Sequence, residues 1–432
     1  MYRHMGFFPQ SIVHGAPRPR RTAGPTCSSR LAGSGAVAVA TVLIATACTT
    51  VTDGAAHRSP GGPPPGAVDV SLLDTGNYPT RPAPPLGAAG TPEKGRLVEG
   101  VRMAEHVVGP WEVDTALTEG VMPTTVLADP TVLRQLLPRK MAAAASKHNF
   151  VTGFSSARRT EPDRVSLVNA VLRFADPESA AAAATELADL SLQPDLDDNL
   201  PLAQPVAMPN NPGTRASTLE TTPPGSTTPK TSVSAYTAHG PFVLHQFADT
   251  LDGVGPAADM VAKTLDQQIS AIDRFVPTPV SELGGLPVDE GGLLARTVPQ
   301  TGDQIPVGKN LVYGPHAALH FQISPQASTQ LFTDLGMGLW ARGKASVYQF
   351  RDAESASEML EQFVRELQDS GNKPVASVPN MPESRCIHVD DPLGSGDVCY
   401  AVADRYVIEG SSAQLTDAHQ QTAAQYAMLM AS

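Results

Sequence analysis

The sequence predicts an α+β protein with two related two-layer units and mainly antiparallel sheets, which follow a signal peptide and a Pro/Gly-rich tether. Three observations support this prediction. Short motifs recur in the same order in both halves of the chain, and each half alternates strand-like with helix-like segments. Apolar residues make up 41% of the 432 residues, which is enough to build real cores.

The first 47 residues have the three parts of a secretory signal. They contain five Arg and no Asp, Glu or Lys, and an apolar run over residues 31–47 ends in small residues before Cys48. These last residues resemble a bacterial lipobox, with Ala45 where Leu is usual, which implies a lipid on Cys48 as the first mature residue. The alternatives are an uncleaved anchor, a plain secreted protein, and a twin-arginine signal at Arg20-Arg21.

Residues 48–95 form the predicted tether. Pro, Gly, Ala and Thr dominate this segment, which therefore cannot bury enough surface to fold alone. Within it, residues 68–73 are expected to dock as an edge strand, followed by a turn over 74–79. Loss of the signal changes the net charge from −12 to −17. This negative charge argues against nucleic acid as a partner. It also predicts that the folded units are repelled from an anionic membrane surface.

The most informative feature is an internal duplication. Five matches fall in the same order in both halves, so chance is a poor explanation, and an N-terminal unit (96–275) and a C-terminal unit (311–432) are predicted to be copies joined by residues 276–310. The matching segments are Gly109-Pro110 with Gly314-Pro315, Pro130–Leu136 with Pro325–Leu331, Phe174–Ala180 with Phe350–Ala356, Pro209–Arg215 with Pro379–Arg385, and Tyr236 with Tyr400.

Each unit is expected to contain the same elements in the same order. A strand ends at Asp176 or Asp352, which is a good N-cap for the helix that follows. A Pro-rich loop, a hairpin and a closing helix complete the unit. The expected ranges in the first and second units are 166–174 and 345–350 for the strand, up to 190 and 367 for the helix, 191–230 and 369–384 for the loop, around 238–240 and 402–405 for the hairpin, and 256–275 and 417–430 for the closing helix.

Cysteine usage supports the duplication. Cys386 and Cys399 are absent together from the first unit, where Ala216 and Ala235 stand at the matching positions. A bridge between two adjacent strands would leave this pattern, so we predict a Cys386–Cys399 disulfide in an oxidising compartment. A reactive or metal-binding thiol pair is the alternative. Cys27 would be removed with the signal.

The chain contains no nucleophile elbow, phosphate loop, dinucleotide fingerprint or zincin helix. We therefore predict no catalytic residue and no cofactor. Three groups with cation-ligand chemistry are assigned to solvated loops or strands rather than to a metal site, and His316 and His320 are expected to share one face of a strand. The groups are Asp195, Asp197, Asp198 and Asn199; His388, Asp390, Asp391 and Asp397; and His316 with His320.

Four further side chains are singled out by their places in the two units. Trp111 and Trp340 stand in apolar settings and are expected to anchor cores. Arg215 and Arg385 occupy equivalent places after a Pro turn. Each is expected either to pair with an acid of its own unit or to contact a ligand.

Several segments resemble actinobacterial cell-envelope lipoproteins of mycobacterial and nocardial type, whose function is unknown. The resemblance implies an envelope lipoprotein with an N-terminal and a C-terminal domain, and it supplies no catalytic residues. The order of strand, helix, Pro loop and Cys-bearing hairpin is similar to extracytoplasmic sensor domains of mycobacterial receptor kinases, at the level of fold alone. The segments are Leu73–Pro79, Arg81–Gly87, Met103–Glu105, Val107–Asp114 and Tyr313–Pro315.

The sequence favours a lipoprotein of the cell envelope, anchored in the membrane on its extracytoplasmic face. We expect it to be a non-enzymatic protein that binds an envelope ligand or a protein partner, with a cleft between its units as the place for the ligand. Two alternatives belong to other classes: an envelope hydrolase with a dispersed active site, and a structural accessory subunit of an envelope complex.

Overall fold

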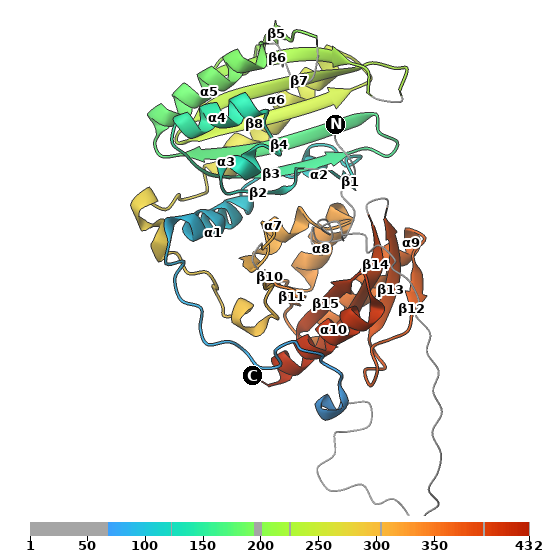
Figure 1. Ribbon diagram of the computed structural model, residues 1–432. Helices are drawn as coiled ribbons and strands as arrows, with labels where there is room; N and C mark the ends of the chain where they lie inside the picture. The colour runs from blue at the N-terminus through green and yellow to red at the C-terminus, as the bar shows by residue number, and fades with distance from the viewer. Residues whose placement is uncertain are drawn as a thin grey trace, which may run out of the picture. The chain divides into compact units, whose positions relative to one another are not determined.

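A computed structural model describes residues 68–121, 123–193, 201–223, 226–302, 305–391 and 394–431. The predicted signal peptide, Cys27, Cys48 and the cluster from Asp195 to Asn199 lie outside these residues. The chain from Val70 to the C-terminus forms one compact unit, which holds both sheets (Figure 1). Among the described residues, no helix combines the length and apolar character that a membrane span requires.

The N-terminal unit is built on an antiparallel sheet of eight strands. The strands lie in the order β1-β3-β4-β8-β7-β6-β5, and β2 pairs with β3. Their bounds are β1 Glu119–Gly120, β2 Thr125–Leu127, β3 Phe150–Arg159, β4 Val165–Phe174, β5 Gln204–Val206, β6 Thr214–Thr221, β7 Lys230–His239 and β8 Phe242–Thr250.

The C-terminal unit repeats this topology. Its seven antiparallel strands lie in the order β9-β10-β11-β15-β14-β13-β12, so every strand from β10 onward has a counterpart from β3 onward in the first sheet. The predicted duplication into two related α+β units is therefore confirmed. The bounds are β9 Leu311–Tyr313, β10 Leu339–Arg342, β11 Ser346–Gln349, β12 Lys373–Val375, β13 Arg385–Asp391, β14 Gly394–Ala403 and β15 Tyr406–Ser412.

Helices cover both faces of each sheet, which adds a layer that the two-layer prediction did not include. In the first unit, Leu172 packs with α5 (Pro177–Ser191), whereas Leu167 packs with α6 (Val254–Ile272). Successive residues of a strand point to opposite faces, so the odd and even positions of β4 serve different helices. In the second unit, α9 (Ala353–Asp369) packs on Tyr400, while α10 (Leu415–Met430) packs on the other face.

The expected caps are present in both units. The Asp176 carboxylate accepts the backbone N–H of Ser179 at 2.7 Å, and the Asp352 carboxylate accepts that of Ser355 at 2.8 Å. Each bond satisfies a backbone donor that a helix N-terminus leaves free. The same residue type therefore starts α5 and α9 for the same reason.

Four shorter helices and one buried ion pair complete the N-terminal unit. The helices are α1 (Pro92–Ala104), α2 (Pro110–Val113), α3 (Pro130–Leu133) and α4 (Arg139–Lys147). Glu99 of α1 is fully buried and pairs with Arg173 of β4, and it also accepts the backbone N–H of Thr278 at 2.8 Å. This carboxylate fastens α1 to the sheet and to the chain that leaves α6.

Two expectations about loops are wrong. The range 191–230 contains strands β5 and β6, because the Thr- and Ser-rich segment from Thr214 pairs along its whole length with β7. Residues 68–73 form a 3-10 turn, Val70–Leu72, instead of an edge strand. The equivalent segment of the C-terminal unit, 369–384, holds the short strand β12.

The end of the predicted tether packs against the C-terminal unit rather than standing free. Tyr78 donates its hydroxyl to Asp417 of α10 at 2.7 Å, and Gln420 donates to Asp74 at 2.9 Å. Further along, the backbone N–H of Ala83 reaches the carbonyl of Ala295 at 2.8 Å. The chain therefore crosses the C-terminal unit before it enters α1.

The predicted disulfide joins Cys386 and Cys399, which lie directly opposite each other on β13 and β14. In the first unit, Ala216 and Ala235 face each other at the same register of β6 and β7. The strand pair of the C-terminal unit thus carries a disulfide, whereas the equivalent pair of the N-terminal unit forms without one.

We predict that the double variant Cys386→Ala/Cys399→Ala folds but loses about 3 kcal/mol of unfolding free energy, the chain-entropy value for so short a loop. Urea unfolding followed by circular dichroism measures the loss. The wild-type protein treated with a reductant is the matched control, because it loses the bridge without a change in sequence. A variant that fails to fold would contradict the equivalence of the two strand pairs.

Candidate functional site

A short helix of the C-terminal unit, α7 (Pro315–Leu319), receives a carboxylate from the N-terminal unit at its first turn. Glu105 follows α1 and accepts the backbone N–H groups of His316 and Ala317 at 3.2 and 3.0 Å. Gly314 permits this approach, since a Cβ there would lie 2.3 Å from a Glu105 oxygen. The Gly-Pro motif detected by duplication thus serves a contact between the two units.

The other end of α7 receives a buried arginine from the same unit. Arg158 of β3 donates to the carbonyls of Gln322 and His320 at 2.6 and 3.3 Å, and to that of Thr118. Its guanidinium also lies over the Trp111 ring, 5.3 Å from the ring centre. Burial lowers the pKa of Arg158 to about 10, against the opposing charge of Glu119, so the group stays cationic at neutral pH.

A hollow of about 720 Å³ opens beside this junction. Five parts of the chain meet there: the end of α1, the loop after it, α2 (Pro110–Val113), the last turns of α6, and the first turn of α7. Six of its lining side chains are titratable, three acids and three bases. They are Glu105, His106, Glu112, Asp266, Arg274 and His316.

Buried amides hold the loop that lines this pocket. Gln268 of α6 accepts the N–H of Val108 at 2.9 Å and donates to the carbonyl of His106 at 2.8 Å. Asn169 of β4 donates to the carbonyl of Val108 at 2.8 Å. Because these partners are buried in the sheet and in α6, the pocket wall is rigidly placed.

Burial and neighbouring charge shift the pocket groups in different directions. Burial raises the pKa of Glu105, although two backbone N–H groups oppose the shift. Burial, together with the charge of Arg274, lowers the pKa of His106. For His316, burial acts downward, but the Glu112 carboxylate at 3.1 Å and the nearby Glu105 raise the pKa overall. The pocket therefore presents charges of both signs.

The structure corrects the expectation for His316 and His320. Residues 315–319 are helical rather than extended, because Gly314-Pro315 starts a helix that Glu105 caps. The two rings lie 5.3 Å apart, but their surroundings differ. His316 faces the pocket, whereas His320 is buried. A hydrogen bond of 2.8 Å joins Nδ1 of His320 to the hydroxyl of Ser156.

The Ser156–His320 pair has the residue types of a nucleophile and base. Both side chains are buried, and neither lines the pocket beside α7 or the hollow along α5. Burial lowers the pKa of His320 well below its usual value, so the ring is neutral. The contact is a core hydrogen bond between β3 and α7.

Arg215 and Arg385 lie at equivalent places on β6 and β13, and each pairs with an acid of its own unit. Arg215 pairs with Asp189 of α5, and Arg385 lies 3.7 Å from Glu361 of α9. Contact with a ligand stays a prediction for both. Trp111 and Trp340 are both 3% exposed, as expected of core anchors.

Sequence patterns did not predict the pocket. Its acids and bases are scattered over more than 200 positions and share no spacing, and only His316 stood out beforehand. A second hollow, of about 620 Å³, lies along α5 and is lined by that helix and His148 alone. Because one exposed helix face supplies nearly all of it, we take the pocket beside α7 as the candidate functional site.

We predict that Arg158→Met lowers the free energy of unfolding by at least about 2 kcal/mol, since buried carbonyls left without donors cost about 1–3 kcal/mol each. Chemical unfolding measures the loss. The control is Arg164→Met, which removes an exposed arginine, paired with Asp252, from the turn between β3 and β4. Equal losses of unfolding free energy in the two variants would show that the contacts of Arg158 with the end of α7 do not stabilise the protein.

We predict that His316 titrates above the usual histidine range and that its pairing with Glu112 stabilises the protein most at mildly acidic pH. A raised folded pKa gives stability that is complete below the unfolded pKa and is lost as pH rises through the folded value. The groups facing His316 are Glu112, Glu105, His106 and His320. NMR titration of the imidazole tests this; Glu112→Gln should lower the pKa, and an unchanged value would refute the pairing.

Comparisons with known proteins complete this description. Residues 86–288 match the family described as the N-terminal domain of unknown function DUF7373, and residues 293–432 match its C-terminal domain. None of the curated proteins compared with the chain matches it.

One solved structure, the extracellular domain of PknH from Mycobacterium tuberculosis, aligns with 40% of this chain and 96% of its own, at 12% identity and a TM-score of 0.28. A TM-score this low supports no conclusion about fold or function. The two family matches together span most of the chain, with one match for each duplicated unit. The chain therefore belongs to the DUF7373 family and carries both of its domains.

Proposed function

We propose that this protein is an extracytoplasmic, lipid-anchored binding protein that holds a small polar ligand in the pocket beside α7. One observation carries the proposal: titratable groups from both DUF7373 domains converge on one hollow. A ligand-binding pocket combines a concave wall with a few polar groups that fix the orientation of the ligand. The second hollow is also lined by charged side chains, but all its lining residues except His148 come from one helix, α5.

The side chains indicate the chemistry of the ligand. Glu105, Glu112 and Asp266 offer acceptors for an amino group, and Arg274 offers a fork of donors for a carboxylate or phosphate. A zwitterionic ligand would satisfy both sets. A purely apolar ligand would leave charged groups desolvated without partners and is disfavoured.

The alternatives have less support. A hydrolase needs a nucleophile and a base that converge in a cleft, whereas the Ser156–His320 pair is buried in the core. A structural accessory subunit would need no charged pocket. The anchored, extracytoplasmic location rests on the signal-like N-terminus and Cys48, and the Cys386–Cys399 disulfide supports an oxidising compartment.

We predict that protein isolated from cell envelopes carries a bound small molecule that native mass spectrometry detects. Glu105→Gln and Arg274→Ala should each reduce its occupancy by roughly tenfold, the usual effect of losing one charged hydrogen bond. The matched control is Glu186→Gln, which changes an acid of the second hollow. Full occupancy in both pocket variants, or no ligand in the wild type, would overturn the pocket.

The anchor is tested separately, so that its failure leaves the pocket standing. We predict that mass spectrometry of the mature N-terminus finds an acylated Cys48 and that Cys48→Ser releases the protein from the membrane fraction. Cys27→Ser is the matched control and should change neither result. An unmodified Cys48 peptide from the mature protein would overturn the localisation.

A further inference from the structure

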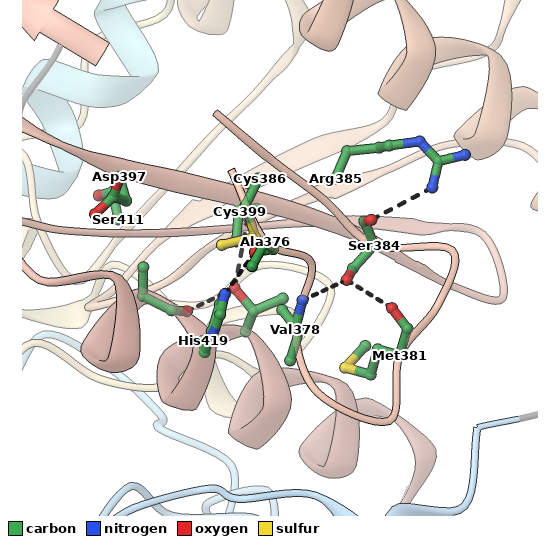
Figure 2. The surroundings of a disulfide bond; sticks show 12 residues. Ala376, Val378, Met381, Ser384, Arg385, Cys386, Asp397, Cys399, Ser411 and His419 are labelled. Atoms are coloured by element: carbon green, nitrogen blue, oxygen red, sulfur yellow. Dashed lines mark hydrogen bonds between the residues drawn. A yellow bond between two sulfur atoms is a disulfide. The ribbon is translucent and has the colours of Figure 1, made fainter. Parts of the chain in front are cut away.

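The disulfide of the C-terminal unit lies against a histidine. Cys386 of β13, Cys399 of β14 and His419 of α10 come from three different elements, and their potential ligand atoms all lie within 4.8 Å of one another (Figure 2). In the described part of the chain, this is the one group of three or more His, Cys, Asp or Glu side chains that is gathered so closely. These three side chains are therefore candidate ligands for a metal ion, in addition to the disulfide that two of them form.

Each of the three side chains is held in place by the fold. The two cysteines are buried and lie directly opposite each other across β13 and β14. His419 is half-buried in the first turns of α10, and its Nε2 makes a hydrogen bond of 2.9 Å with the carbonyl of Ala376 (Figure 2). His419 is therefore the member of the group that is partly exposed to solvent.

We propose that reduction of the Cys386–Cys399 bond converts this group into a Cys₂His site for Zn²⁺. Two thiolates and one imidazole form a ligand set that zinc accepts in tetrahedral geometry, with water in the fourth position. Zinc–sulfur bonds of about 2.3 Å place two thiolates about 3.7 Å apart. Reduction removes the covalent bond between the sulfurs, and side-chain rotation can then bring the two thiolates to this separation.

The chemistry balances with a thiol as the reductant. Two equivalents of an external thiol reduce the bond: the protein S–S bond breaks, both cysteines gain a proton, and the reductant leaves as a disulfide. Zinc then displaces the two thiol protons, while the neutral imidazole of His419 exchanges its hydrogen bond with Ala376 for the metal.

The sister unit lacks all three ligands together. Ala216 and Ala235 stand at the positions of the cysteines, and α6, the counterpart of α10, has no histidine in its first two turns, residues 254–261. The N-terminal unit folds the same strand pair without any of them. Because the fold does not require these side chains, their joint presence in one unit is consistent with a shared role.

The test uses the full chain with Cys27→Ser and Cys48→Ser, so that Cys386 and Cys399 are the only thiols. The protein is produced in a reducing cytosol, its two free thiols are verified by alkylation and mass spectrometry, and Co²⁺ is titrated anaerobically as a spectroscopic probe for Zn²⁺. Three comparisons accompany it: the oxidised protein, His419→Ala, and Cys386→Ala/Cys399→Ala, which reproduces the alanine pair of the sister unit.

We expect the reduced protein to bind one Co²⁺ with a thiolate-to-metal charge-transfer band, which Zn²⁺ then displaces. The oxidised and double-alanine proteins should show no band, and His419→Ala should bind at least about tenfold more weakly. No band in the reduced protein, an equal affinity in His419→Ala, or loss of native circular dichroism on reduction would each overturn the proposal.

Discussion

The contact between the two units depends on how α7 is held. A five-residue helix has little stability of its own, because nearly all its backbone groups belong to one of its ends. Glu105 accepts the free N–H groups at its start, and Arg158 donates to the carbonyls of His320 and Gln322, which follow its last residue. Each charge has the sign that the helix dipole favours, and both come from the N-terminal unit. The pocket lies beside these contacts of Glu105 and Arg158 with α7.

Duplication explains the architecture, and divergence explains the chemistry. Both sheets share a strand order, capped helices and hairpins, because these features serve the packing of any copy. The differences lie in side chains that the fold tolerates. A cysteine pair in one unit is an alanine pair in the other, and Gly314 admits the Glu105 carboxylate where Gly109 admits the Trp111 ring.

Much of the fold could be predicted, since it depends on local signals. Asp176 and Asp352 mark helix starts by a cap that needs only neighbouring residues. The first unit lacks both cysteines together, which indicated that Cys386 and Cys399 pair with each other. The predictions failed where a partner outside the segment decides. The polar strand β6 lies between β7 and the short β5 and pairs with both, and residues 315–319 are helical because Glu105, more than 200 positions away, caps them.

By itself, the sequence determined the duplication, the α+β class, the capped helices and the disulfide, because these follow from periodicity and from residues compared between two copies. Tertiary structure alone decided the pocket. Its charged groups stand on five separate parts of the chain, and their pKa values depend on burial and on neighbours that no spacing reveals. Tertiary structure also brought His419 to the cysteines, by packing α10 on β14 and β15.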